Sequence, residues 1–402
     1  MKQLKKIPTL LTKYSIQLAY ALSSLFFKVD PNKITIATYR SNELEGNLAY
    51  IANEIERIDP QKHCFVLAKK FDSSLTGKIS YFFHLIRASV HLATSRFFIV
   101  DDFYFPIYVV KPRNGSEFVQ LWHAAGAFKK FGWSTIGKEF GPSEDYLKTV
   151  KVHSNYSRVY VSSEKVIPAY AEAFNMSEEQ IYPLGVPRTD YFYQYDEHKK
   201  LKSRFYQQYP QLQGKKIILY APTFRGKSHY QEEFEMPMDL DLMRKNLDDE
   251  YALIIHLHPY MKLHLSGIEQ FSDFVLHINK GYNIQELLVL ADMLITDYSS
   301  VIFDYSLLRR PIAFIATDLE EYLKERDFYY PYLDFIPGPF FTETLPLTNW
   351  IKEKGYNMTK IEEFQQEFFD YADGRASERI VNHLLIIKQS KLVQVSLINR
   401  SE

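Results

Sequence analysis

The feature that most constrains this chain is a repeated alternation of short apolar runs with longer stretches of helical periodicity. In the first half, β-branched and aromatic residues gather in runs that we expect to form buried strands, at residues 33–38, 65–68, 97–100, 118–121 and 158–161. Helical patterns at 44–58 and 81–93 separate several of these runs. Strands that alternate with helices build βαβ units, so the pattern predicts a parallel sheet.

A second series of the same kind occupies the second half. Its strands are expected at residues 216–220, 251–257, 274–278, 293–296 and 312–315, with a helix at 283–291. Pro and Gly punctuate residues 182–188, which places the junction there. We therefore predict an α/β protein with two Rossmann-like domains, over residues 31–190 and 191–390, preceded by a helix within residues 1–30.

The N-terminus carries an apolar stretch at residues 14–27 that resembles a signal peptide at first sight. Gln17 interrupts it, no small-residue cleavage site follows, and the stretch is too short to span a bilayer. An amphipathic helix at a membrane surface and a first helix docked on the protein's own core both fit. The lysine cluster before it favours the membrane: Lys2, Lys5, Lys6 and Lys13.

Composition excludes several classes of protein. The formal net charge is −1, which argues against a nucleic-acid partner because such proteins need a basic field. Cys64 is the single cysteine, so intramolecular disulfides and cysteine-based zinc sites are ruled out. We expect Cys64, which lies in an apolar run, to be a core residue.

Neither half contains G-x-G-x-x-G or a P-loop, so a standard dinucleotide or P-loop nucleotide site is not supported. Open parallel sheets nevertheless bind ligands outside the carboxyl ends of their strands. Two such domains facing each other would form a cleft, and we expect the chemistry at strand ends on both of its sides.

The sharpest single segment follows the expected strand at 293–296. Ser299 and Ser300 stand where helix N-cap residues belong, and a helix N-terminus with free N–H groups can bind a pyrophosphate. Asp297, Ser300 and Asp304 share one face by their spacing. A capped helix without any ligand is the alternative interpretation.

Two further basic groups follow strands in the second half. His256 and His258 project to the same side of one strand, and Arg225 follows another. A histidine pair could bind a metal, but no third ligand is evident nearby, so phosphate contact is the preferred interpretation. Arg225 could fork onto phosphate oxygens, or it could be an ordinary loop arginine.

In the first half, His123 ends a strand and is followed by small residues and Lys129. A nearly neutral base beside cations suits deprotonation of a hydroxyl that attacks a phosphate. A buried structural histidine is the alternative, but the small neighbours, which allow close approach of a substrate, favour a function.

Five motifs in this order resemble the CDP-glycerol glycerophosphotransferase family of teichoic-acid enzymes: WHAAGAFKKFG, GVPRTDYF, YAPTFR, HLHPY and TDYSSVIFDY. The resemblance implies a glycosyltransferase-B-like fold, a CDP-polyol donor, a lipid-linked disaccharide acceptor and peripheral attachment to the cytoplasmic face of the cell membrane. It implies no metal and no cofactor, and it leaves homo-oligomerisation open.

The same resemblance implies roles for single residues. The catalytic residues would be His123, as general base, and Asp297. The donor pyrophosphate would be held by Arg225, His258, Ser299, Ser300 and Asp304. The acceptor side would include Trp122 and Lys129.

One departure affects the choice of substrate. Many members have W-H-G-T-P in the first motif, whereas this chain has W-H-A-A-G at residues 122–126, which is more similar to primase-type and ribitol-type members. Because the chain is short for a polymerase, we expect a primase that transfers glycerol phosphate from CDP-glycerol to an undecaprenyl-diphosphate disaccharide and releases CMP. A CDP-ribitol transferase of the same family and a nucleotide-sugar glycosyltransferase are the alternatives.

Overall fold

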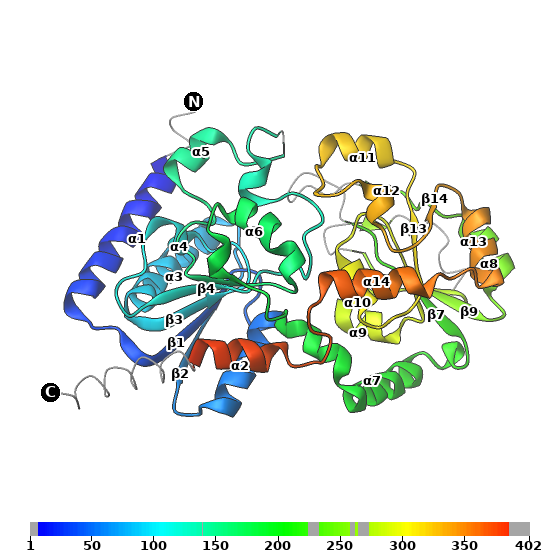
Figure 1. The fold of residues 1–402 in the computed structure, drawn as a ribbon, viewed down its shortest axis with the longest axis horizontal. Helices are drawn as coiled ribbons and strands as arrows, with labels where there is room; N and C mark the ends of the chain where they lie inside the picture. The colour runs from blue at the N-terminus through cyan, green and yellow to red at the C-terminus, as the bar shows by residue number, and fades with distance from the viewer. Residues whose placement is uncertain (1–6, 139, 224–232, 258–261, 264–272, 386–402) are drawn as a thin grey trace. The chain divides into compact units, whose positions relative to one another are not determined.

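The computed structural model describes residues 7–138, 140–223, 233–257, 262–263 and 273–385. The chain divides into two compact units (Figure 1), one comprising the residues up to Asp190 with the segment from Arg375, the other spanning Tyr191–Gly374. Each unit contains a six-stranded parallel sheet with helices packed against it. The predicted α/β class with two Rossmann-like domains is confirmed.

The sheet of the first unit has the strand order β2-β1-β3-β4-β5-β6, and all of its strands are parallel. Its inner strands are buried on both faces, as β-branched and aromatic runs require. The strands are β1 (Asp30–Thr38), β2 (His63–Ala68), β3 (Ser95–Val100), β4 (Glu117–Gln120), β5 (Arg158–Tyr160) and β6 (Ile181–Tyr182).

The sheet of the second unit has the order β11-β9-β7-β12-β13-β14 and is also parallel throughout. Its strands are β7 (Lys216–Tyr220), β9 (Tyr251–Ile255), β11 (Val275–His277), β12 (Met293–Thr296), β13 (Ile312–Ile315) and β14 (Phe340–Phe341). A separate parallel pair is formed by β8 (Glu233–Phe234) and β10 (Lys262–Leu263).

Several helices begin at a polar residue whose side chain caps the first turn. In α9, Asn283 accepts from the Glu286 N–H while the Glu286 carboxylate accepts from the Asn283 N–H, a reciprocal capping box. The first unit contains α1 (Ile7–Phe26), α2 (Gly46–Ile58), α3 (Leu75–Thr94), α4 (Phe105–Val109), α5 (Glu144–Thr149) and α6 (Ile167–Phe174). The second contains α7 (Tyr195–Gln208), α8 (Leu240–Leu247), α9 (Ile284–Leu290), α10 (Val301–Ser306), α11 (Leu319–Glu325), α12 (Tyr332–Phe335), α13 (Thr344–Glu353) and α14 (Met358–Phe368).

The helical residues 376–385 return to the first unit and pack beside α2, as the red helix in Figure 1 shows. The Asp190 carboxylate accepts from the N–H groups of Ala376 (2.7 Å) and Ser377 (2.9 Å), which caps this helix. Ile380 and Val381 then join the core of the first unit. The segment is therefore fixed to that core by both a cap and apolar burial.

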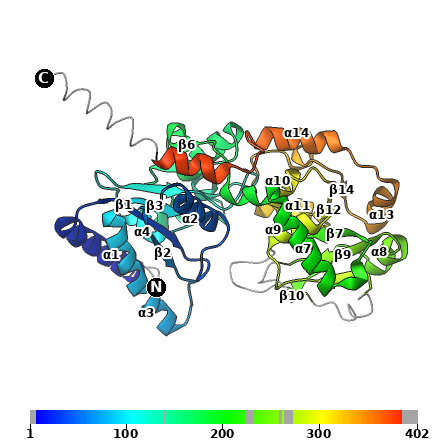
Figure 2. The same cartoon turned by 90° about the horizontal axis from the view of Figure 1, so that it is seen from below.

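Helix α1 lies against α3 and α4 (Figure 2) with an unusual distribution of side chains. Its polar groups bind the protein: Lys13 Nζ donates to Thr149 O (2.7 Å), Gln17 Nε2 to Val109 O (2.8 Å) and Tyr20 Oη to Lys111 O (2.7 Å). Ile16 is buried, but many other apolar residues of the helix point outward, including Leu11, Leu18, Leu22, Leu25 and Phe26. Within the part of the chain that the structure describes, no helix is both long enough and apolar enough to cross a membrane.

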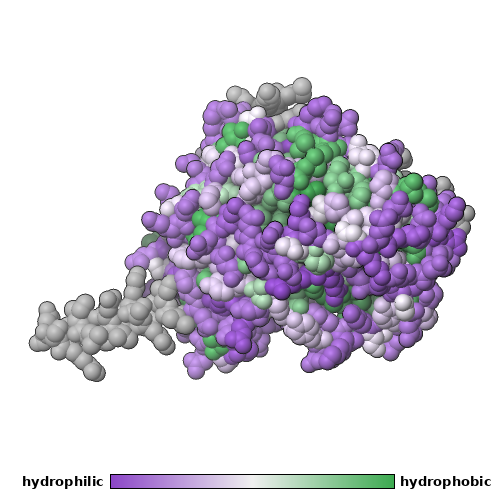
Figure 3. Space-filling model, turned by 45° about the vertical axis from the view of Figure 1, so that its right-hand side comes forward, coloured by the Kyte–Doolittle hydropathy of each residue, from purple (hydrophilic) through white to green (hydrophobic). Residues whose placement is uncertain are grey.

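Strand β2 departs from the prediction for Cys64. The side chain of Cys64 is exposed rather than buried, and Phe65 and Val66 beside it are also exposed. The reason is the strand order, since β2 lies at the edge of its sheet and lacks a neighbour on one side. The face shown in Figure 3 is mostly hydrophilic, with one gathering of hydrophobic residues near its upper centre and smaller ones elsewhere.

Candidate active site

Each sheet has one point at which the strand order reverses, and the polar residues of interest gather there. In the first unit the reversal lies between β1 and β3, and in the second it lies between β7 and β12. Ligands of open parallel sheets bind outside the carboxyl ends of the strands at this point. Arg40 and Asp102 follow β1 and β3, whereas Thr223 and Asp297 follow β7 and β12.

His123 is presented by a strained turn at the end of β4. Trp122 has a φ of 54°, in the left-handed region that residues with a side chain seldom adopt. Two side chains hold this turn: Gln120 Oε1 accepts from the Trp122 N–H (2.8 Å), and Asn47 Nδ2 donates to the Trp122 carbonyl (2.6 Å). A strained residue held at both of its peptide groups indicates a position fixed for function.

Asn47 and Arg188 extend this clamp to the His123 backbone. The buried Asn47, in the first turn of α2, also accepts from the Arg188 N–H through its Oδ1 (2.9 Å). Arg188 Nη1 in turn donates to the His123 carbonyl (2.9 Å). The backbone of residues 122–123 is therefore tied to two segments of the first unit that are distant in sequence.

A carboxylate stands beside the His123 ring. Asp102 Oδ1 lies 3.6 Å from His123 Nδ1, and Asp102 Oδ2 is paired with the Arg40 guanidinium. The Asp102 side chain is buried, and its Oδ1 also accepts from the Phe103 N–H (2.6 Å). A carboxylate in this position can stabilise a positive charge on the imidazole.

Burial lowers the pKa of His123 to about 4, and the Asp102 carboxylate opposes this shift. The side chain is 37% exposed, yet protein atoms surround the ring closely enough to desolvate it. The direction of the shift keeps the imidazole neutral near pH 7. His123 is thus able to accept a proton, and Asp102 is placed to stabilise the resulting cation.

Asp101 adds a second acidic group to this cluster. Its Oδ1 is buried and has no hydrogen-bond partner among the described residues. Desolvation, together with the neighbouring Asp102 charge, raises the pKa of Asp101 to about 7. Burial and the nearby Asp102 carboxylate therefore both disfavour ionisation of Asp101.

The Trp122 ring is buried in an aromatic cluster that supports the turn. It stacks on Phe131 with ring centroids 5.1 Å apart and meets Phe174 and His153 edge-on. Gly132 is required for this packing, because its φ is 57° and a Cβ would lie 2.2 Å from the Ala173 carbonyl oxygen. Trp122, predicted on the acceptor side, packs directly against His123, with ring centroids 4.3 Å apart.

In the second unit, Asp297 is buried and bound to the neighbouring loop. Its Oδ1 accepts from the Thr223 N–H (2.7 Å), and its carbonyl accepts from Tyr332 Oη (3.1 Å). Thr296 Oγ1 also donates to the Ala221 carbonyl (2.7 Å). These bonds join the carboxyl ends of β7 and β12 and fix the backbone two residues before Arg225.

Ser299, Ser300 and Asp304 surround the start of α10. Ser300 occupies the N-cap position and is exposed, but its side chain makes no capping hydrogen bond. Ser299 Oγ accepts only weakly from the Val301 N–H (3.5 Å). Asp304 is buried in the helix, so it does not share an exposed face with Ser300.

The remaining predicted residues have different outcomes. Arg225 and His258 lie outside the described residues. Lys129 follows β4 and is half-buried. His256 Nδ1 contacts the Ile278 carbonyl (2.7 Å), and burial lowers its pKa. Among the residues that the structure describes, no cluster of three or more His, Cys, Asp or Glu side chains could hold a metal ion.

Arg40, Asn47, Asp102 and Arg188 were not among the predicted site residues. Arg188 lies in the GVPRTDYF motif but was given no role there, and the other three belong to none of the five motifs. Arg40 and Asp102 could have been found from the rule for strand ends, because each comes two residues after an expected strand. Asn47 carries no such signal, since its role depends on a contact with residue 122.

Comparison with known proteins gives a consistent assignment. A sequence profile of the family described as CDP-glycerol:poly(glycerophosphate) glycerophosphotransferase matches residues 18–386. The chain is 45% identical over 383 residues to the teichoic acid ribitol-phosphate primase of Bacillus spizizenii, covering 95% of this chain and 98% of that protein. It is 33% identical over 301 residues to the teichoic acid glycerol-phosphate primase of Bacillus subtilis, covering 75% and 76%.

The fold is similar to that of the wall teichoic acid polymerase TagF, with a TM-score of 0.76, 23% sequence identity and 97% of each chain covered. This likeness concerns the fold alone and supports the glycosyltransferase-B-like architecture that the motifs implied. The profile match extends over nearly the whole chain and includes every motif on which the resemblance was based. This chain belongs to the CDP-glycerol:poly(glycerophosphate) glycerophosphotransferase family.

Proposed function

We propose that this chain is a primase that transfers ribitol phosphate from CDP-ribitol to a lipid-linked teichoic-acid acceptor and releases CMP. The observation that carries the choice of ribitol is the 45% identity to a ribitol-phosphate primase over 98% of that protein's length. Transfer of glycerol phosphate from CDP-glycerol is the second candidate. It is favoured by the family description and by the 33% identity to a glycerol-phosphate primase.

The geometry around His123 supports its assignment as general base. The acceptor hydroxyl gives its proton to the neutral imidazole, and its oxygen attacks the phosphorus that bears the polyol. The bond from that phosphorus to the bridging oxygen breaks, and CMP leaves with the electron pair. Asp102 stabilises the imidazolium that forms, at an Nδ1 to Oδ1 distance of 3.6 Å.

The second unit is proposed to bind the donor. Ser300 is exposed at the start of α10, and within the described residues Ser299 Oγ makes just a weak contact with the Val301 N–H, so both hydroxyls suit donation to phosphate oxygens. Asp297 acts in this proposal as a positioning residue, because its carboxylate holds the Thr223 N–H. Arg225 lies two residues after Thr223 in the sequence, and its guanidinium would also bind the donor phosphates.

The test is CMP release by the purified chain given CDP-ribitol or CDP-glycerol. Two acceptors are compared, a disaccharide lipid and the same lipid carrying a first polyol phosphate. The proposal is supported if the wild type releases CMP faster from CDP-ribitol than from CDP-glycerol. His123→Ala and Ser300→Ala should lose this activity, and His63→Ala should keep it. His63 is an exposed histidine on β2 and serves as the matched control. Faster release from CDP-glycerol would show that the transferred group is glycerol phosphate and not ribitol phosphate. Retained activity in His123→Ala would overturn the mechanism.

We further propose that the outward face of α1 attaches the enzyme peripherally to the cytoplasmic face of the membrane, where its lipid-linked acceptor would be found. This face includes Leu18, which is 62% exposed, and Leu25, which is 75% exposed. Exposed Leu75, Ile79 and Phe83 repeat at helical spacing on the neighbouring α3. Adjacent helices that both expose apolar side chains can bury them in the bilayer interface.

Flotation with vesicles containing anionic lipid tests this attachment. The double variant Leu18→Glu/Leu25→Glu should no longer float with the vesicles, because it places charges on the apolar face. It should still fold, because the polar side of α1 remains bound to the protein. Leu345→Glu, at an exposed leucine of α13, is the matched control and should float like the wild type. Equal flotation of all three proteins would remove α1 from the proposal.

A further inference from the structure

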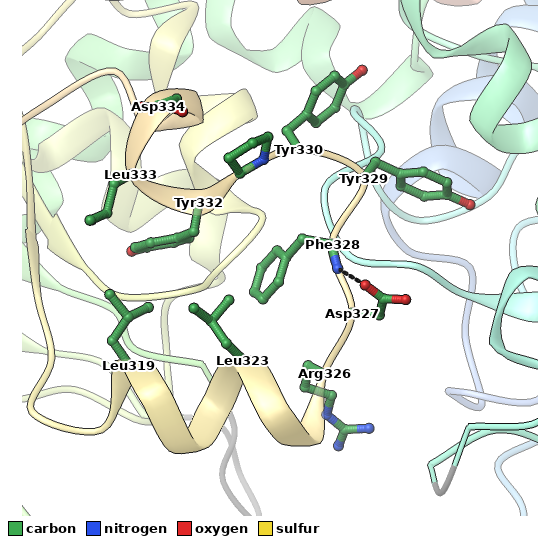
Figure 4. Close-up of a pocket in the computed structure, with 11 residues that line it drawn as sticks. Leu319, Leu323, Arg326, Asp327, Phe328, Tyr329, Tyr330, Tyr332, Leu333 and Asp334 are labelled. Carbon is green, nitrogen blue, oxygen red and sulfur yellow. Dashed lines mark hydrogen bonds between the residues drawn. The ribbon is translucent and has the colours of Figure 1, made fainter.

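The Asp102 carboxylate and the His123 imidazole follow different strands, yet they lie 3.6 Å apart. Asp102 Oδ1 accepts from the adjacent Phe103 N–H (2.6 Å). Figure 4 shows the same local bond in the second unit, beside α11, where Asp327 Oδ1 accepts from the Phe328 N–H (3.1 Å). Such a bond orients a carboxylate relative to its own main chain, but it does not fix the distance to a residue on another strand. The separation of the pair therefore depends on a connection between the two strand ends.

The side chain of Gln120 makes this connection. The backbone hydrogen bonds between β3 and β4 continue as far as the Leu121 N–H, which donates to the Val100 carbonyl (2.8 Å). Beyond this point Gln120 Nε2 donates to the Asp102 carbonyl (3.0 Å), and Gln120 Oε1 accepts from the Trp122 N–H (2.8 Å). The amide lies between the two strand ends like an additional peptide group.

The Gln120 amide has one orientation that satisfies both neighbours. The Asp102 carbonyl can only accept and the Trp122 N–H can only donate, so an exchange of Oε1 and Nε2 would break both bonds. Nε2 also donates to the Tyr156 hydroxyl (2.9 Å). The Gln120 side chain is fully buried, so loss of its bonds would leave main-chain groups unpaired away from water.

A network of buried, uncharged groups holds the Tyr156 hydroxyl in turn. Tyr156 Oη lies 2.9 Å from Tyr108 Oη and 3.1 Å from His153 Nδ1. Tyr108 Oη also accepts from the Tyr104 N–H (3.2 Å). Burial lowers the pKa of His153 to about 3, so its ring is neutral near pH 7 and can accept a hydrogen bond. Buried networks whose members are satisfied are rigid, and this one supports the Gln120 amide.

We propose that Gln120 is a positioning residue that holds the Asp102 carboxylate beside the His123 imidazole. This role rests on the proposed function, in which the pair carries out proton transfer. Gln120 acts by joining the main chain of Asp102 to that of Trp122, which precedes His123. A carboxylate beside Nδ1 favours the tautomer with the proton on Nδ1, which leaves Nε2 free to accept the proton of the acceptor hydroxyl.

Two variants remove the connection. Gln120→Met has a side chain of similar length without an amide, and Gln120→Asn keeps an amide but is one methylene too short to join both strand ends. Gln365→Met is the matched control, because Gln365 of α14 is also buried, at 3% exposed, and accepts from Arg309 (3.2 Å). Thermal melting and the Kd for the CDP-polyol check that each variant is folded.

The first measurement is kcat for CMP release. We expect both Gln120 variants to lower kcat about tenfold, because a displacement of catalytic groups by about 1 Å can cost up to about a hundredfold in rate. Their Kd for the CDP-polyol should stay within about twofold of the wild type, and Gln365→Met should keep both values. An unchanged kcat in a folded Gln120 variant would overturn the proposal.

Double variants with Asp102→Asn separate positioning from general support of the fold. In that background the Gln120 substitutions should lower kcat less than about threefold, because the charge that Gln120 positions is already gone. Equal effects in the presence and absence of the Asp102 charge would show that Gln120 supports the fold without aligning the pair.

Nitrogen NMR of the histidine rings at pH 7 gives a readout that needs no turnover. The His123 signals are assigned by their loss in His123→Ala. We expect the proton on Nδ1 in the wild type and in Gln365→Met, and a mixture of tautomers in both Gln120 variants. Unchanged His123 signals in the folded Gln120 variants would overturn the proposal. Failure of the proposed function looks different: the wild type would turn over no CDP-polyol, while the His123 tautomer would still decide whether Gln120 positions the pair.

Discussion

The contact between Asp102 and His123 leads to a quantitative prediction for the Asp102→Asn variant. The change keeps the size of the side chain and the oxygen that can accept from the Phe103 N–H, and it removes the negative charge 3.6 Å from His123 Nδ1. The imidazolium formed during proton transfer then loses its stabilising partner. We expect kcat to fall while the Kd for the CDP-polyol stays unchanged.

The size of the effect follows from Coulomb's law. Two unit charges at this distance interact by about 1 kcal/mol in bulk water and by about 4–5 kcal/mol at an effective dielectric constant of about 20. The His123 side chain is 37% exposed and Arg40 neutralises part of the Asp102 charge, so the lower part of this range applies, about 1–2 kcal/mol. Since about 1.4 kcal/mol corresponds to a tenfold change in rate, kcat should fall about 5- to 30-fold.

The pH dependence of kcat gives a second, independent test of the contact between Asp102 and His123. Burial lowers the pKa of His123 to about 4, and Asp102 raises it. The wild type should therefore keep its activity below pH 6.5, and Asp102→Asn should move the acid limb of kcat to still lower pH because the opposing charge is gone. Initial rates of CMP release between pH 4 and 8 measure both quantities. Asp59→Asn, at the end of α2, is the control and should behave like the wild type. The reasoning is refuted if Asp102→Asn has a kcat within twofold of the wild type and an unmoved acid limb.

Two predictions concern stability and are measured by thermal melting. Gly132→Ala should destabilise the first unit by about 2–3 kcal/mol, because the new Cβ would lie 2.2 Å from the Ala173 carbonyl oxygen. Gly137→Ala, whose Cβ would meet no atom within 4 Å, should cost about 1 kcal/mol for its positive φ alone. Equal melting temperatures of the two variants would contradict this packing. Asp190→Ala should cost about 1–2 kcal/mol and increase hydrogen exchange in residues 376–385, since it removes the acceptor that caps that helix; unchanged exchange there would show that the cap is not needed.

Much of the fold could be predicted from the sequence because the central strands are fully buried. Residues 216–220, 293–296 and 312–315 were expected as strands, and β7, β12 and β13 have those bounds. Continuous apolar runs bounded by turn residues leave little ambiguity in such strands. The edge strand β2 shows the limit, since an apolar run does not reveal which of its residues lack a neighbouring strand, and Cys64 was wrongly expected in the core.

Contacts between residues distant in sequence could not be predicted in this way. The cap of residues 376–385 depends on a carboxylate 186 positions earlier, and no local pattern indicates that pairing. The same holds for Asn47, whose amide joins Trp122 to Arg188. His123 could be chosen as a candidate because a strand end and small neighbours are local features, whereas its partners are brought to it by strand order.

The carboxylates at the two points of strand reversal differ in a way that assigns them different tasks. Asp102 is paired with Arg40 and stands beside a partly exposed imidazole, so its charge can act on a reaction. Asp297 is buried and its Oδ1 accepts from the Thr223 N–H, which commits that oxygen to holding the backbone. A carboxylate bound in this way contributes to the order of its loop more directly than to proton transfer. Asp297→Asn, which retains an oxygen that can accept from Thr223, should therefore preserve more activity than Asp297→Ala, and equal loss in both variants would assign the Asp297 charge itself to the reaction.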